Sequence, residues 1–283
     1  MIPAAFAYQR PASLDEALRA IAADPDAKVL AGGHSLLPLL KLRLARADAL
    51  IDIGRLKELK GLRYAADGSA SVGALTTYAE LASATRLDFV REGLLMAADV
   101  QVRNRATVGG AVAHADPASD LPALLIALDA SIVVRSSREE RVIPATDFFL
   151  GPFETAVRPS ELVIELRRPA LPAGAGGAYR KLAQPASGFA LVGVCAVVAR
   201  TGGRIGHARV ALTGVSDSAY RATAVEEALV GTDGSSGAIA AAAAEATVNR
   251  TVNHDIHADR EYRKAMAEVY TRRAIEAALA RAT

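Results

Sequence analysis

The order of apolar and polar positions predicts a mixed α and β chain in three parts. Residues 1–57 alternate short apolar runs, typical of buried strands, with segments in which apolar positions recur at helical spacing. In SLDE, Ser13 stands three residues before Glu16, the pattern of a capping box at a helix start. The elements expected here are strands at residues 6–8, 28–30 and 50–53, a helix after Ser13 and a helix over residues 36–44 with Ser35 as its N-cap.

Residues 58–172 carry shorter alternating runs, which predict a second part built from antiparallel strands and helices. The runs LRYA and SASVGAL flank the turn sequence ADG and so predict a hairpin. The other elements expected here are helices from Thr77, near residues 89–98 and at 119–128, and strands near 131–135, 141–143 and 161–167.

Residues 173–283 form the third part, and LPAGAGG at residues 171–177 is the best linker candidate because small, flexible residues interrupt the periodicity there. Cys195 lies within a long apolar run and is expected in the core. The elements expected are three strands of an antiparallel meander at residues 178–182, 189–200 and 204–212, followed by helices at 221–230, 236–249 and 260–280.

Composition narrows the function classes. The 33 basic and 31 acidic residues give a net charge of +2 with no concentrated basic run, so nucleic acid and anionic membranes are poor partners. No apolar stretch reaches the length of a transmembrane segment and no signal-peptide pattern opens the chain, which predicts a cytoplasmic protein. The single cysteine excludes a four-cysteine iron–sulfur cluster in this chain, and His254 and His257 lack a third ligand nearby, so no metal site is expected.

A pair of glycines in KVLAGGHSLLPLLKLRL suggests an anion site. Gly32 and Gly33 separate a predicted strand from a predicted helix, and residues without a Cβ let backbone N–H groups approach a bulky ligand. Free amides at such a place bind phosphate readily. The alternative, an ordinary strand-to-helix turn, stays open for this motif alone.

A second glycine pair, Gly109 and Gly110, follows 77 positions later in TVGGAVAHADPASDLP. Two loops that each offer backbone N–H groups could hold a diphosphate from both sides, while Asp116 or Asp120 accepts hydrogen bonds from ribose hydroxyls. Neither the Rossmann fingerprint nor the P-loop motif occurs in the chain. The residues therefore favour either a nucleotide site outside the Rossmann class or two unrelated turns.

Three ordered motifs carry a resemblance over essentially the whole chain: AGGHS at residues 31–35, TVGG at 107–110 with ADPASDLP at 115–122, and KLAQPASGFALVG at 181–193. Together they resemble the FAD-binding medium subunits of molybdenum hydroxylases, the family of the carbon monoxide dehydrogenase medium subunit and the xanthine dehydrogenase FAD domain. The resemblance implies an α+β fold: a two-part FAD-binding domain of the vanillyl-alcohol-oxidase or PCMH type, at residues 1–57 (α/β) and 58–172 (α+β), then a C-terminal domain at 173–283 with a small antiparallel sheet and helices.

The resemblance also implies which residues hold FAD. The segments 31–35 and 107–110 would surround the pyrophosphate, Asp120 would meet a sugar or ribityl hydroxyl, and Leu162 and Lys181 would flank the flavin. Ala111 stands where the family often has asparagine, so one hydrogen bond of the family pattern is missing. The implied cofactor-binding residues are Leu30, Ala31, Gly32, Gly33, His34, Ser35, Leu36, Thr107, Gly109, Gly110, Ala113, His114, Asp116, Ser119, Asp120, Leu162 and Lys181, with no catalytic residue and no metal ligand.

The implied function is electron transfer. Relatives receive electrons from [2Fe–2S] clusters of a small subunit, after substrate oxidation at the molybdopterin cofactor of a large subunit, and form dimers of heterotrimers. This chain would pass those electrons through FAD to an external acceptor. The alternatives are a self-sufficient flavin oxidoreductase of the vanillyl-alcohol oxidase type and a noncatalytic nucleotide-binding module.

Overall fold

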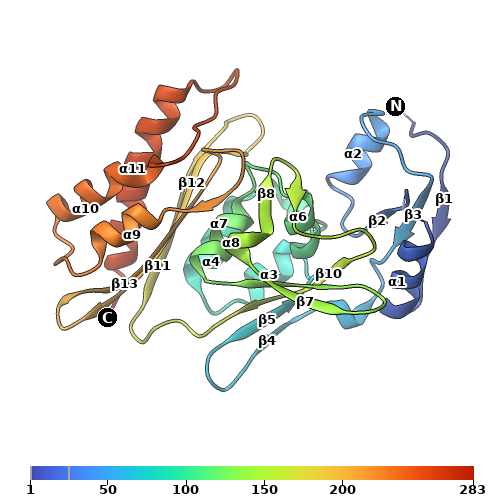
Figure 1. The fold of residues 1–283 in the computed structure, drawn as a ribbon, viewed down its shortest axis with the longest axis horizontal. Helices are drawn as coiled ribbons and strands as arrows, with labels where there is room; N and C mark the ends of the chain where they lie inside the picture. Colours follow the sequence, from blue (N-terminus) through green and yellow to red (C-terminus); the bar gives the residue numbers. More distant parts are fainter. Residues whose placement is uncertain (1, 25) are drawn as a thin grey trace.

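The computed structural model describes residues 2–24 and 26–283, in which three sheets of three to five strands follow one another along the chain (Figure 1). The N-terminal part, blue in Figure 1, and the C-terminal part, orange and red, lie at opposite ends with the central part between them. This mixed helix-and-sheet architecture agrees with the fold class expected from the sequence. Among the helices of the described residues, none combines the length and apolar content needed to span a bilayer.

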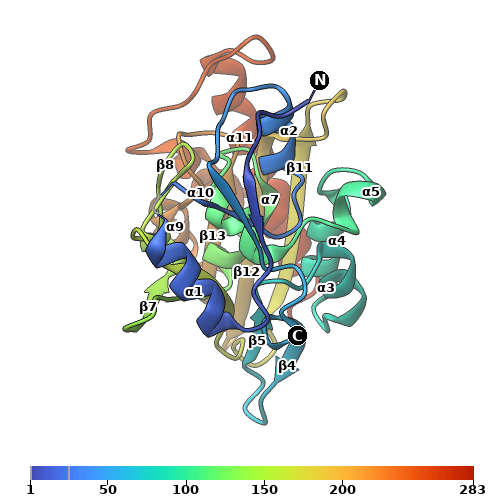
Figure 2. The same ribbon diagram turned by 90° about the vertical axis from the view of Figure 1, so that its right-hand side faces the viewer.

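The N-terminal part is a small parallel sheet with the strand order β1-β3-β2. Ser13 accepts a hydrogen bond from Glu16 N at 3.2 Å and so caps the first helix, but the Glu16 carboxylate bonds Ala12 N, so the expected capping box is incomplete. Leu18 and Ile51 pack in the core of this part, and Figure 2 shows the helix beside the sheet. The elements are β1 (Ala7–Gln9), α1 (Leu14–Ala23), β2 (Lys28–Leu30), α2 (Leu36–Lys41), β3 (Ala49–Asp52) and the 3₁₀ turn η1 (Lys57–Leu59).

The central part is a five-stranded sheet with the order β4-β5-β10-β6-β7, antiparallel at every pairing. Helix α7 is buried along its whole length because DLPALLIA is apolar on every side after its first residue. The elements are β4 (Leu62–Tyr64), β5 (Ala70–Gly73), α3 (Tyr78–Ala84), α4 (Asp88–Met96), α5 (Val100–Arg103), α6 (Val108–His114), α7 (Asp120–Ala127), β6 (Ser131–Arg135), β7 (Glu140–Pro144), α8 (Ala145–Phe148), β8 (Phe149–Gly151), β9 (Glu154–Thr155) and β10 (Leu162–Arg168).

The C-terminal part confirms the predicted meander, a sheet of order β11-β12-β13-β14. Its long central strand is buried on both faces: Val194 and Ala196 pack in the C-terminal core, whereas Cys195 and Val197 pack in the core of the central part. The elements are β11 (Gly176–Ala183), β12 (Ala190–Thr201), β13 (Arg204–Thr213), β14 (Tyr220–Arg221), α9 (Thr223–Leu229), α10 (Ser236–Ala244), η2 (Glu245–Thr247) and α11 (Arg260–Leu279).

Three sequence expectations need correction. The helix expected over residues 36–44 ends at Lys41, because Arg43 has a left-handed backbone with φ of 59° that no helix accommodates. The linker expected over 171–177 is shorter, since β11 already begins at Gly176. The helix expected over 236–249 ends at Ala244 and continues only as a 3₁₀ turn.

Candidate functional site

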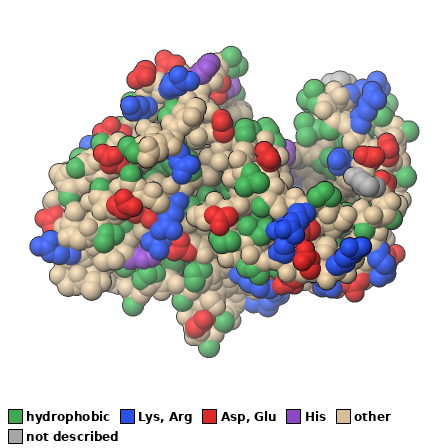
Figure 3. Space-filling model, viewed as in Figure 1, with side chains coloured by type: hydrophobic (Ala, Val, Ile, Leu, Met, Phe, Trp, Pro, Cys, Tyr) green, Lys and Arg blue, Asp and Glu red, His purple; other side chains and the backbone are tan. Residues whose placement is uncertain are grey.

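The two glycine segments meet in the structure although 77 positions separate them. A Cβ built on Gly32 would lie 2.2 Å from the carbonyl oxygen of Arg105 and 3.0 Å from Cα of Ala106. Any side chain at residue 32 would therefore push the first glycine loop away from the segment that enters α6. Figure 3 shows the surface hollowed between the N-terminal part, at the right, and the central part.

The first loop presents unused backbone donors. Within the described residues, the N–H groups of Gly32, Gly33, His34 and Ser35 make no hydrogen bond. Gly33 has φ of +81°, a conformation that favours glycine. The loop directly follows the carboxyl end of β2, the edge of a parallel sheet where ligands bind in α/β folds. Ser35 occupies the N-cap position of α2 but its side chain caps nothing, so its hydroxyl is not consumed by the helix.

The second segment differs from the expectation that its glycines offer amides. Gly109 N donates to Ala74 O at 2.8 Å and Gly110 N donates to Thr107 Oγ1 at 3.2 Å. Both glycines lie in the first turn of α6, with Thr107 as N-cap, rather than in a loop before a helix. Their N–H groups build the structure, and the contact with Gly32 comes instead from the backbone of Arg105.

Asp120 is the centre of a second, buried group of candidate residues. Its Oδ2 accepts a hydrogen bond from Lys181 Nζ at 2.8 Å, and its Oδ1 accepts one from Tyr179 Oη at 2.5 Å. Lys181 Nζ also donates to the carbonyl oxygen of Met96 at 3.1 Å. The side chains of Lys181 and Asp120 are only 2% and 6% exposed, so this ion pair is screened little by water.

Burial dominates the protonation chemistry of this group. Loss of water raises the pKa of Asp120, while the neighbouring Lys181 ammonium and the Tyr179 hydroxyl oppose that rise. Burial also raises the pKa of Tyr179 and of Tyr78, and the charge of Asp120 adds to both effects. Both phenols therefore stay protonated, and Tyr179 acts as a hydrogen-bond donor.

Several of the remaining candidates make contacts within the protein itself. The His114 ring packs on Phe153 with centroids 5.1 Å apart, and Asp116 Oδ1 accepts from Ala118 N in the turn before α7. Leu162 is buried in the core of the N-terminal part. Their contact with a ligand stays a prediction, as does that of Leu30, Ala31, Leu36, Ala113 and Ser119.

Sequence reasoning missed Tyr179 and Arg105. A signal for Tyr179 was present, because residues two apart on a strand share a face and Lys181 was already a candidate. No signal existed for Arg105, since it contributes a backbone carbonyl through a tertiary contact.

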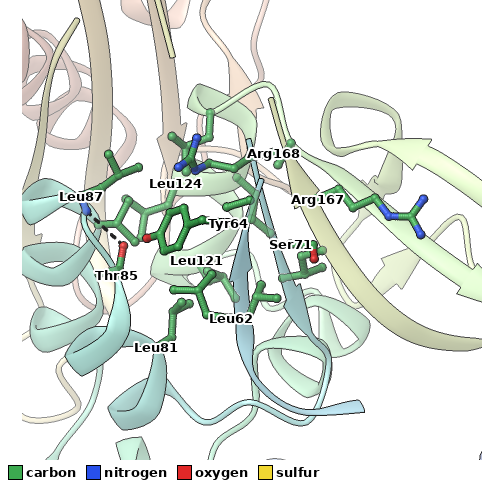
Figure 4. Close-up of a pocket in the computed structure, with 17 residues that line it drawn as sticks. Leu62, Tyr64, Ser71, Leu81, Thr85, Leu87, Leu121, Leu124, Arg167 and Arg168 are labelled. Atoms are coloured by element: carbon green, nitrogen blue, oxygen red, sulfur yellow. Dashed lines mark hydrogen bonds between the residues drawn. The ribbon is translucent and has the colours of Figure 1, made fainter. Parts of the chain in front are cut away.

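An apolar cavity of about 60 Å³ lies between the central sheet and the helices α3, α4 and α7 (Figure 4). Leu62, Leu81, Leu121 and Leu124 project into it, and Tyr64 lies across it. Such a lining has few partners for phosphate or sugar hydroxyls, so a nucleotide is not expected there.

Comparison with known proteins shows the family. Residues 4–171 match the family described as the FAD binding domain in molybdopterin dehydrogenase, and residues 177–278 match the CO dehydrogenase flavoprotein C-terminal domain. The chain is 40% identical to the carbon monoxide dehydrogenase medium chain of Hydrogenophaga pseudoflava, over 99% of each chain.

Solved structures agree over the same length. The fold superposes with a TM-score of 0.96 and 42% identity, covering 100% of both chains, on carbon monoxide dehydrogenase from Hydrogenophaga pseudoflava lacking the Mo-pyranopterin moiety of its molybdenum cofactor. It superposes with a TM-score of 0.92 and 35% identity, covering 98% of both chains, on quinoline 2-oxidoreductase from Pseudomonas putida 86.

Proposed function

The chain belongs to the family of FAD-binding subunits of molybdopterin dehydrogenases, and we propose that it is the electron-transfer subunit of a molybdenum hydroxylase complex. It binds FAD, receives electrons from [2Fe–2S] clusters of a partner chain and delivers them to an external acceptor. The single observation that carries the FAD site is that the N–H groups of residues 32–35 make no hydrogen bond within the described residues, in a loop whose Gly32 closely approaches the backbone of Arg105.

The residues of the first loop fit the FAD pyrophosphate. Its four unused N–H groups supply hydrogen-bond donors, and Gly32 leaves space that a Cβ would fill. Thr107, Gly109 and Gly110 fix the neighbouring backbone from the other side. The proposed contacts comprise the glycine loop Leu30, Ala31, Gly32, Gly33, His34, Ser35 and Leu36, the α6 region Thr107, Gly109, Gly110, Ala113 and His114, and Asp116, Ser119, Asp120, Leu162 and Lys181.

Asp120 and Lys181 supply fixed charges toward the flavin in this proposal. Each oxygen of Asp120 keeps a second lone pair after its hydrogen bond to Tyr179 or Lys181, so a ribityl or ribose hydroxyl has an acceptor there. Bound FAD supplies the chemistry, because a flavin exchanges electrons singly or in pairs. The protein residues bind the cofactor, orient it and exclude water from it.

Partner chains are needed for the rest of the pathway. The one cysteine, Cys195, is fully buried in β12, and burial raises the pKa of its thiol, so this chain supplies no thiolate ligand for a cluster. We assign the [2Fe–2S] clusters to a small partner and the molybdopterin cofactor to a large one. The assembly we propose is a dimer of such heterotrimers in the cytoplasm.

The finer fold assignment belongs to the same proposal. We assign residues 1–57 and 58–172 to the two subdomains of a PCMH-type FAD-binding domain, and residues 173–283 to the C-terminal domain. The three larger sheets each lie within one of these ranges, and this supports the division.

Co-purification with the neighbouring gene products tests the function. The tagged full-length chain should bring down two partners, one containing iron and one containing molybdenum. Under anaerobic conditions, carbon monoxide, an aldehyde and an N-heterocycle such as quinoline are added in turn, and one of them should bleach the FAD absorption. A chain that carries FAD but associates with no iron-containing partner would contradict the electron-transfer assignment.

A further inference from the structure

The buried hydrogen bonds around Asp120 join two parts of the molecule. Asp120 is the first residue of α7 in the central part, whereas Tyr179 and Lys181 stand two apart on β11 of the C-terminal sheet. One carboxylate thus receives two side chains from the same face of one strand, one on each oxygen.

Tyr179 is held in place by a site shaped for its hydroxyl. Its side chain is fully buried, and a Cβ on Gly193 would lie only 2.3 Å from Tyr179 Oη. Gly193 pairs with Lys181 across the β11 and β12 ladder, so the glycine makes room for the phenol beside the strand position of the lysine. The hydroxyl donates to Asp120 Oδ1, and this bond has no replacement from water in so buried a place.

We propose that Tyr179 is a positioning residue for the charge pair: its hydroxyl holds Asp120 as a carboxylate against the Lys181 ammonium, so that the pair presents no net charge to the flavin. This inference rests on the proposed function, which places Asp120 and Lys181 at FAD. It adds a role for a residue that does not itself touch the cofactor.

The physical reason lies in what remains when the hydroxyl is removed. Asp120 would keep its bond to Lys181 but lose the donor on its other oxygen while still buried, which favours the neutral acid. Tyr78 on α3 and Cys195 on β12 face the same group, and burial keeps both protonated and neutral. The Lys181 charge would then be uncompensated and would stabilise reduced, anionic flavin.

Reduction potentials of FAD in the complete complex test this role. Tyr179→Phe and Asp120→Asn should both raise the midpoint potential, because each leaves Lys181 without a carboxylate partner. We expect each variant to strengthen the binding of reduced FAD about tenfold relative to that of oxidised FAD. This change raises the midpoint potential by about 30 mV for a two-electron couple. The double variant should shift no further than Asp120→Asn alone, since the tyrosine acts through the charge of Asp120. The shift caused by Tyr179→Phe should grow as the pH falls.

Tyr220→Phe is the matched control. Tyr220 is also buried, and its hydroxyl donates to Ala246 O at 2.9 Å in the C-terminal part. This variant should lower the melting temperature while leaving the FAD potential unchanged. The proposal is overturned if Tyr179→Phe behaves like this control, or if its shift adds to that of Asp120→Asn. A wild-type complex without FAD would instead refute the proposed function.

Discussion

Replacing Gly32 by alanine tests the contact between the two glycine segments. The new Cβ would stand 2.2 Å from Arg105 O, whereas ordinary contacts begin near 3.4 Å, so the two backbones must separate by about 1.2 Å. All three atoms within 3.0 Å of this Cβ belong to the backbone of Arg105 and Ala106, so no flexible side chain can turn aside. Overpacking of this kind costs about 1–3 kcal/mol.

The FAD affinity should carry most of this cost, because the separated segments no longer fit one ligand. A loss of 1–3 kcal/mol corresponds to roughly 5–150-fold weaker binding. The assay is a titration of the flavin-free complex with FAD, followed by flavin fluorescence, with the melting temperature of the flavin-free protein measured in parallel.

Gly237→Ala provides the matched control for this experiment. Gly237 lies in α10, and a Cβ there would meet no atom within 4 Å. Alanine favours the helical backbone, so affinity should stay unchanged and stability should stay equal or rise slightly. Equal FAD affinity for Gly32→Ala and the wild type would refute the two-segment site.

Three further predictions concern stability. Gly193→Ala should lower the free energy of unfolding by about 1–3 kcal/mol in a urea titration, because its Cβ would collide with Tyr179 Oη, and an unchanged midpoint would contradict that packing. Thr107→Ala should lower the free energy of unfolding by about 1 kcal/mol because it removes the hydroxyl that caps Gly110 N, whereas Thr107→Ser should be nearly neutral. Thermal melts of the two variants test this, and equal melting temperatures would contradict the capping role. Hydrogen bonds from the Arg141 side chain and from Arg158 N hold the pKa of Glu161 below its usual 4.5, so the carboxylate stabilises the fold fully above that pH and loses this effect as the pH falls through its lowered pKa. Glu161→Gln should therefore weaken the loss of stability at acid pH, measured as the urea midpoint against pH. An unchanged loss would exclude the Glu161–Arg141 pair as its source.

Local sequence patterns predicted the helices and strands well where a capping residue or an apolar run marks the element. Ser13 marked the start of α1, and the three apolar runs after residue 177 marked the meander strands β11 to β13. Boundaries failed where a helix ends on a left-handed non-glycine residue, as at Arg43, where Arg43 N donates to Leu40 O and Leu44 N to Leu39 O to close the helix end locally. A left-handed non-glycine residue carries no signal in the sequence.

The site was predicted only in its parts. The glycines of residues 32 and 33 indicated a loop with free donors, which the structure contains. The second pair looked alike in sequence but lies inside α6, because Thr107 and Ala74 supply acceptors from positions that a sequence pattern cannot reveal. Likewise, Asp120 and Lys181 were candidates separately, and only the fold shows that they form one buried pair completed by Tyr179.

The measurement that tests the account most directly is the cofactor content of the purified chain, produced with its neighbouring gene products. Acid release should yield FAD at about one per chain, with iron and molybdenum assigned to other polypeptides. A colourless preparation that also fails to take up added FAD would contradict the account and leave the Gly32 loop as a turn.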